Sequence, residues 1–344
     1  MIKRYSCNLS EDFLKDTKIT PYWVTGITDG GGKFSITLKS KICYCSFEIT
    51  QKKVDNTLYM LYFIQEYFNC GEIVLDSKQF DNKYNTYKFI VTNLEDLCNI
   101  ILPHFDKYPL ITSKHLDYLD FKKIVLMCKE GLNLININRE KIFSIKNNMN
   151  SKRSFYERLD FNLSIKSQKL NNEWVQAFID IRGLFHFYVS KIEINTCINI
   201  PFLILRLRND EFKLIILLME ILGKASFPRE IINIDILKSN RTFLCGFFNC
   251  FEIIKFVDKY EMFTYNNFDY YLWKKLINLN DKEAYNTWDD LSKMWGIKYL
   301  MYGDKIYLGG DYIKKMPFYI DKNISFRTKN LDYFSFQFKE VTLN

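Results

Sequence analysis

The chain contains one internal duplication. The pattern Trp-Val-x-Gly-Ile-Thr-Asp-x-x-Gly-x-Phe at residues 23–34 recurs as Trp-Val-x-Ala-Phe-Ile-Asp-x-x-Gly-x-Phe at residues 174–185, an offset of 174 − 23 = 151. A second block recurs at 259 − 107 = 152. Its members Lys107-Tyr108, Thr112, Asp117-Tyr118 and Lys122-Lys123 reappear as Lys259-Tyr260, Thr264, Asp269-Tyr270 and Lys274-Lys275. Two separated blocks at nearly one offset indicate two copies of one structural unit.

Each copy predicts the same order of elements. Thr20 with Pro21, and Asn171 in the second copy, suit the start of a helix, because Thr and Asn are good N-caps and Pro fits the first helical position. A glycine ends each helix, and alternating strands follow. Further strands are expected at 43–51 and 202–208, and amphipathic helices at 58–68 and 212–222. The expected class is α+β, with two pseudo-symmetric αββαββα repeats whose antiparallel sheets each have one apolar and one polar face.

These patterns divide the 344 residues into five parts. An N-terminal extension (1–17) precedes the first repeat (18–138), a basic linker (139–169) precedes the second repeat (170–280), and a C-terminal extension (281–344) follows. The linker carries eight basic and three acidic residues, which suits either a solvated connection or contact with phosphate.

Composition limits the partners. Lys and Arg exceed Asp and Glu by 48 − 40 = 8, which is compatible with a polyanionic partner. No apolar run reaches the roughly 18 residues of a membrane span, so no membrane partner is expected. The nine cysteines form no CxxC pair, which argues against a zinc site. Cys43 and Cys45, two residues apart in a strand, are expected to face one side as reduced core residues.

Residues 24–32, Val-Thr-Gly-Ile-Thr-Asp-Gly-Gly-Gly, resemble the nine-residue motif of the LAGLIDADG homing endonuclease and maturase family, and residues 175–183 resemble a second copy. The stretch 104–118 and the ending 131–150 are also similar, so the resemblance covers roughly 18–280. It implies two motif helices packed at a pseudo-twofold axis, with Gly26 and Ala177 as the small residues between them, and sheets that form a nucleic-acid-binding saddle. Gln176, bulkier than usual at the second motif position, suggests either a looser seam or one bridged by a polar side chain.

In this family the eighth motif position carries Asp or Glu, and the pair binds the divalent metal that drives phosphodiester hydrolysis. Those positions here are Gly31, which has no side chain, and Arg182, a permanent cation. The resemblance therefore implies no catalytic residue, no metal and no cofactor. Asp29 and Asp180 lie two residues earlier, about 200° around the helix, and are expected to form hydrogen bonds at the helix ends.

The remaining surface predicts contact with nucleic acid, because Arg and Lys bind phosphates and polar side chains read base edges. The candidate contacts are Lys39, Lys41, Lys52, Lys53, Lys114, Arg182, His186, Tyr188, Lys191, Arg206 and Arg208.

The resemblance and the missing acids together predict a catalytically inactive nucleic-acid-binding protein. RNA is favoured over DNA, either as a maturase on a group I intron or as a ribosome-associated ribonucleoprotein component. The alternative is an active, Mg-dependent homing DNA endonuclease. Abundant Phe, Tyr, Ile, Asn and Lys, which have A/T-rich codons, favour an organelle-encoded protein of the mitochondrial matrix. A fused pair of repeats has less need of a dimer partner, so a monomer is expected.

Overall fold

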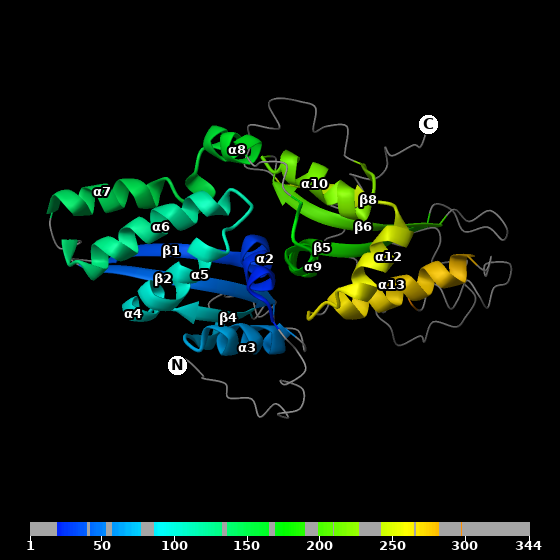
Figure 1. Cartoon of the computed structure of the whole chain (residues 1–344), viewed down its shortest axis with the longest axis horizontal. Helices are drawn as coiled ribbons and strands as arrows, with labels where there is room; N and C mark the ends of the chain where they lie inside the picture. The colour runs from blue at the N-terminus through cyan, green and yellow to red at the C-terminus, as the bar shows by residue number, and fades with distance from the viewer. Residues whose placement is uncertain are drawn as a thin grey trace, which may run out of the picture.

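The computed structural model describes residues 19–39, 42–52, 57–76, 86–132, 136–164, 169–189, 199–208, 210–226, 242–264, 266–281 and 297. Two similar α/β units lie next to each other, and one helix from each packs against the other between them (Figure 1). The predicted N-terminal extension, and the C-terminal extension apart from Asp281 and Ile297, lie outside the described residues.

The first unit consists of α2 (Pro21–Gly31), β1 (Gly32–Lys39), β2 (Ile42–Lys52), α3 (Thr57–Phe68), β3 (Glu72–Asp76), β4 (Thr86–Val91), α4 (Leu94–Asp96), η1 (Leu97–Ile101), α5 (Leu102–Lys107) and α6 (Lys114–Lys129). The connection between the units contains α7 (Asn136–Asn147), η3 (Asn150–Lys152) and α8 (Phe155–Ser164).

The second unit consists of α9 (Asn172–Arg182), β5 (Gly183–Val189), β6 (Asn199–Arg208), α10 (Phe212–Leu222), β7 (Ala225–Ser226), β8 (Thr242–Phe247), α12 (Cys250–Lys259) and α13 (Asn266–Asp281). The described strands form two antiparallel sheets of the same topology, β1-β2-β4-β3 and β5-β6-β8-β7. The α+β class with two αββαββα repeats is therefore confirmed.

The motif helices begin where the sequence predicts. The Thr20 hydroxyl accepts a hydrogen bond from Trp23 N at 3.3 Å, and Asn171 Oδ1 accepts from Glu173 N at 2.9 Å. These side chains satisfy amide groups that have no partner within the first turn of a helix. Thr20 Oγ1 also donates to Glu173 Oε2 at 2.6 Å, so the two helix starts are joined across the repeats.

The duplicated second block forms the same hydrogen bonds in both units. Tyr118 donates to Asp106 Oδ1 at 2.7 Å, and Lys122 Nζ bonds the same carboxylate at 2.7 Å. In the second unit Tyr270 and Lys274 bond Asp258 at 2.6 and 2.8 Å. Each set joins the long helix of its unit (α6 or α13) to the shorter helix before it. The recurrence of these residue types at one offset thus has a structural cause.

The connection at 139–169 was predicted to be either solvated or in contact with phosphate, and for two of its basic residues both interpretations are wrong. Arg153 is 7% exposed and its Nε donates to Asp117 Oδ1 at 2.8 Å. Arg158 is 3% exposed and its Nε donates to Asp210 Oδ1 at 3.0 Å. In addition, α7 packs on α6 and α8 packs on α10 (Figure 1).

None of the helices among the described residues has the length and hydropathy needed to span a membrane.

Candidate nucleic-acid interface

The seam between α2 and α9 is closely packed. A Cβ added to Gly26 would lie 2.5 Å from the Trp174 carbonyl oxygen and 2.8 Å from Ala177 Cβ. Only glycine leaves room for the α9 backbone at this position. The seam is neither looser nor bridged by Gln176, because the helices approach closely at Gly26 and the Gln176 Nε2 donates to the Glu261 carbonyl of its own repeat. Small side chains thus set how closely the two sheets approach.

Arg182, the last residue of α9, reaches across the pseudo-twofold axis. Its Nε donates to the Gly30 carbonyl oxygen at 2.5 Å, and its Nη1 donates to the Arg206 carbonyl oxygen at 3.2 Å. The guanidinium therefore bonds to the C-terminal end of the opposite motif helix, where carbonyl groups carry partial negative charge. Burial lowers the pKa of Arg182 from its ordinary value.

Gly31, the matching position in α2, is close to two side chains. A Cβ there would lie 3.2 Å from both Gln51 Nε2 and Ile181 Cγ2. The groups nearest to where a side chain would begin are thus a neutral amide and a methyl group. Neither offers the carboxylate that hard divalent cations prefer.

The two motif aspartates are used in structural hydrogen bonds. Asp29 accepts from Ile111 N (2.9 Å), Thr112 Oγ1 (2.6 Å) and Trp174 Nε1 (2.8 Å). Asp180 accepts from Phe263 N at 2.7 Å and Thr264 N at 3.1 Å. Both carboxylates are buried, at 0% and 2% exposure. The partners lie more than 80 residues away in the chain, so each aspartate ties its helix end to the loop before α6 or α13.

Lys114 and Asn266 occupy matching positions in the two repeats, and both donate hydrogen bonds to backbone carbonyls at the ends of the motif helices. Lys114 Nζ donates to the carbonyls of Thr28, at 2.7 Å, and Gly32. Asn266 Nδ2 donates to the Asp180 and Gly183 carbonyls at 2.7 and 3.0 Å. The second repeat thus keeps the hydrogen bonds while losing the charge.

Burial, and secondly the charge of Arg182, lower the pKa of Lys114 to about 7. The unfolded chain holds this proton up to about pH 10.5, its ordinary value, whereas the folded protein releases it from about pH 7. Between these values the folded state binds fewer protons, so stability rises with pH; below pH 7 the cost of the buried charge is fully present.

We expect the melting temperature of the wild type to rise relative to K114M between pH 6 and pH 9, as followed by circular dichroism. An unchanged difference would contradict this.

The outer face of the first sheet is polar. Lys33, Thr37 and Lys39 alternate along β1 and are exposed, while Phe34 and Ile36 point into the core. Of the candidate contacts, Lys39 therefore lies on this outer face. Lys41, Lys53 and Lys191 lie outside the described residues, and for Lys52 and Tyr188 only the backbone, at the ends of β2 and β5, is described.

The outer face of the second sheet was predicted to be polar, and this is wrong for its middle part. Phe202 and Ile204 are on that face of β6 but are only 4% and 1% exposed. The His186 ring stacks on Phe202 with centroids 5.0 Å apart, and Phe202 stacks on Phe248 at 5.1 Å. His186 of β5 is thus part of an aromatic row with Phe202 of β6 and with Phe248, the residue directly after β8, and Arg206 is an exposed cation further along β6.

The Arg208 guanidinium is held by side chains of the protein itself. Its Nη2 donates to Ser113 Oγ and lies 3.4 Å from Asp210 Oδ2, while its Nε lies 3.5 Å from Glu211 Oε1. Ser113 belongs to the first repeat and Asp210 to the second. This arginine joins the repeats, so its predicted role as a free phosphate contact does not fit the structure.

Comparison with known proteins agrees with this architecture. Residues 24–125 match the sequence profile of the LAGLIDADG endonuclease family. The solved structure of I-SmaMI bound to uncleaved DNA target in the presence of calcium ions aligns with a TM-score of 0.69 at 25% identity, over 83% of this chain and 99% of that chain. The first repeat is thus similar to this family in sequence, and the two-repeat fold is that of LAGLIDADG homing endonucleases. A second LAGLIDADG structure, I-AabMI bound to uncleaved DNA, aligns with a TM-score of 0.67 at 21% identity, over 82% of this chain and 99% of that chain.

Curated relatives share parts of the chain. Probable intron-encoded endonuclease 2 of Neurospora crassa is 32% identical over 127 residues, which is 37% of this chain and 26% of the relative. The uncharacterized mitochondrial protein RF1 of Saccharomyces cerevisiae is 29% identical over 163 residues, 47% of this chain and 31% of the relative. The chain thus matches about a quarter to a third of these relatives' length. Intron-encoded and mitochondrial relatives point to an organellar origin.

Sequence reasoning missed two cations on the outer face of the first sheet. Lys33 shares the outer face of β1 with Lys39, and the period-two pattern could have identified it. Lys88 of β4 lies 3.3 Å from Glu48 of β2 in an ion pair on the outer face. No local pattern in the sequence pairs these two strands.

Proposed function

We propose that this protein binds nucleic acid on its paired sheets without hydrolysing it. The observation that carries the proposal is the hydrogen bond from Arg182 to the Gly30 carbonyl across the pseudo-twofold axis, 2.5 Å long. A guanidinium occupies the centre where the family's motif would place metal-binding acids, and Gly31 supplies no carboxylate.

The charges around this centre support the same conclusion. After burial, the charges of Arg208 and Arg206 also lower the pKa of Arg182, whereas Glu211 and Asp29 raise it. The carboxylate of Asp29, the acidic residue of α2, already accepts hydrogen bonds from Ile111, Thr112 and Trp174. Clustered cations repel Mg²⁺ but suit a phosphate, to which guanidinium and ammonium groups bond strongly. Without a metal, water activation for phosphodiester hydrolysis loses its usual agent.

A DNA duplex is the first candidate ligand. I-SmaMI and I-AabMI are both described as bound to DNA targets, and the paired sheets of this chain have the same architecture. The second candidate is RNA, in an intron maturase or a ribosome-associated component of the mitochondrial matrix. The observation that favours RNA is the loss of both acids in a chain that keeps the full two-repeat fold, since a protein unable to cut has no use for a cleavage site.

The test is recovery of the ligand from organelle lysate with the full chain, sequencing of the bound nucleic acid, and a cleavage assay on the recovered sequence with Mg²⁺ or with chelator. Binding that survives the chelator, with no cutting in Mg²⁺, is the expected result. Whether DNA or RNA is recovered chooses between the two candidates. Mg²⁺-dependent cutting of a recovered DNA site would overturn the proposal in favour of an active endonuclease.

Charge removal on the outer face should weaken binding in a salt-dependent manner. R206Q is expected to reduce the slope of log K against log [salt] by about 1, because one phosphate contact is lost. The matched control is K123Q, since Lys123 is an exposed cation of α6, which packs on the opposite, core side of β1 and β2. The slopes are measured by fluorescence anisotropy. Equal slopes for the two variants would place the ligand elsewhere.

A further inference from the structure

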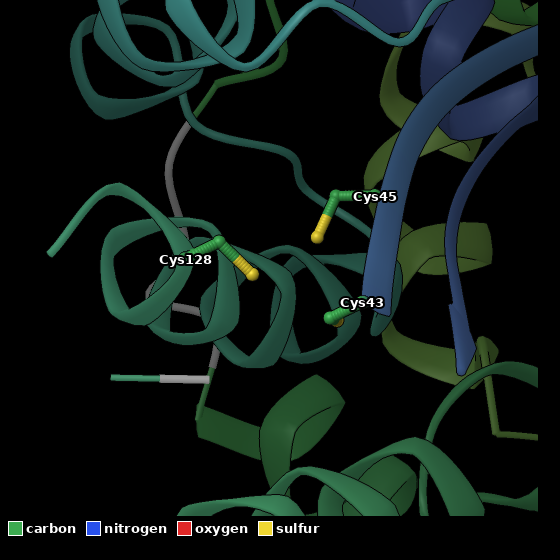
Figure 2. A group of neighbouring side chains, drawn as sticks. All are labelled: Cys43, Cys45 and Cys128. Carbon is green, nitrogen blue, oxygen red and sulfur yellow. The ribbon is translucent and has the colours of Figure 1, made fainter. Parts of the chain in front are cut away.

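Three cysteines meet at one end of the first repeat (Figure 2). Cys43 and Cys45 lie on the core side of β2, and Cys128 lies in the last turn of α6. Their three Sγ atoms are all within 4.8 Å of one another. Cys45 is 6% exposed, and the other two are partly buried. The spacing gives no motif, because Cys128 lies 128 − 45 = 83 residues beyond its nearest partner.

The geometry suits a metal with three sulfur ligands. An ion with metal–sulfur bonds of about 2.3 Å holds three sulfurs about 4 Å apart, so each sulfur needs to move by less than an ångström. A disulfide, by contrast, requires a sulfur–sulfur distance of about 2 Å and uses only two of the three. Thiolate sulfur is soft, and three such ligands select ions such as Zn²⁺ and Cu⁺ over Mg²⁺ and Ca²⁺.

A positive charge lies near the cluster, because Lys146 of α7 acts electrostatically on Cys43. Thiols lose their protons when they bind a metal, so metal binding is expected to release protons. Three thiolates around Zn²⁺ carry a net charge of −1, which Lys146 can balance.

We propose that Cys43, Cys45 and Cys128 form a binding site for a thiophilic metal ion, Zn²⁺ or Cu⁺. Cu⁺ is satisfied by three sulfurs, whereas Zn²⁺ takes a water as its fourth ligand. The ion joins the start of β2 to the end of α6 and so fixes the sheet of the first repeat against its longest covering helix.

This site is separate from the seam between the repeats. Cys43 pairs with Leu38 at one end of the β1–β2 hairpin, while Ile49 pairs with Gly32, directly after α2. Six residues of extended strand (49 − 43) span about 20 Å. Metal binding at the cysteines is thus independent of the nucleic-acid proposal, and either can fail alone.

The experiment uses the reduced full chain, stripped with chelator and then titrated with Zn²⁺ or, anaerobically, with Cu⁺. Bound metal is counted by native mass spectrometry, and the melting temperature is followed by circular dichroism. The wild type is expected to retain one ion per chain and to melt at a higher temperature when loaded. C128S is expected to bind at least tenfold more weakly, and C43S likewise. The matched control C70S, which alters a partly buried cysteine of the same repeat outside the cluster, is expected to bind like the wild type.

The two ions distinguish the form of the site: retention of Cu⁺ but not Zn²⁺ assigns a three-coordinate site, and retention of Zn²⁺ assigns a site completed by water. Equal metal binding by wild type and both serine variants would overturn the proposal. So would a stripped, reduced wild type that retains neither ion, or a mass 2 Da lower in the untreated protein that reveals a disulfide within the cluster. If C128S does not fold, C43S alone decides, since Cys43 is only partly buried.

Discussion

Asp210→Ala is expected to lower the free energy of unfolding by about 3–5 kcal/mol, because it leaves a buried cation without its partner. Asp210 is 1% exposed and accepts from Arg158 Nε at 3.0 Å, Ser113 Oγ at 3.0 Å and Asn162 Nδ2 at 3.1 Å. These donors come from the first repeat and from α8, so one carboxylate joins three parts of the chain. Equilibrium unfolding in urea measures the loss.

The matched control is Asp258→Ala. This aspartate also bonds a cation, Lys274 Nζ at 2.6 Å, but the two side chains are 44% and 35% exposed. Water screens such a pair, and about 0–1 kcal/mol is expected from its removal. A double variant, R158M/D210A, should be more stable than D210A alone, because the uncompensated charge is also gone. A loss for D210A no larger than for D258A would show that Arg158 finds another partner at little cost.

Local sequence patterns were sufficient for the elements and their order. Alternation of Phe34, Ile36 and Leu38 with polar residues identifies the core face of β1, because successive side chains of a strand point to opposite faces. The predicted strand 43–51 is observed at Ile42–Lys52, and the predicted helix 212–222 at Phe212–Leu222. The duplication extended each assignment to the other repeat.

Contacts between distant segments could not be predicted in this way. Arg208 looks like a free cation on a strand, but Ser113, 95 residues earlier, and Glu211 bind it. Arg158 looks like part of a basic linker, but its partner Asp210 is 52 residues away. Phe202 follows the strand pattern yet is buried on the outer face. Charge and alternation describe a residue's neighbours along the chain, whereas these roles depend on neighbours brought together by folding.

The same distinction applies to the motif aspartates. Hydrogen bonding was predicted for Asp29 and Asp180 because helix rotation turns them away from Gly31 and Arg182. The structure supplies the partners, which are Thr112 and Thr264 with their adjacent amides. Both threonines belong to the second duplicated block. The two blocks therefore recur together because the residues of one block hydrogen-bond those of the other.

Gly26→Ala is expected to destabilise the protein by about 1–3 kcal/mol, although alanine is normally the better helix former by roughly 0.5–1 kcal/mol. The added Cβ would lie 2.5 Å from the Trp174 carbonyl oxygen and 3.1 Å from Trp174 Cα. Backbone atoms cannot rotate away as a side chain can, so α9 must shift as a unit. Because β5 follows α9 directly, that shift also changes how the second sheet faces the first, and nucleic-acid affinity should fall together with stability.

A double variant separates the two contacts of the added methyl group. In G26A/A177G the 2.8 Å contact with Ala177 Cβ is gone, while the contact with the Trp174 carbonyl stays. Only part of the lost stability should therefore return, measured by urea unfolding of the wild type, both single variants and the double variant. Full recovery would mean that side-chain contact alone sets the helix separation. A G26A protein as stable as the wild type would mean that the seam is looser than the structure shows, and the close approach of the two repeats would then need another cause.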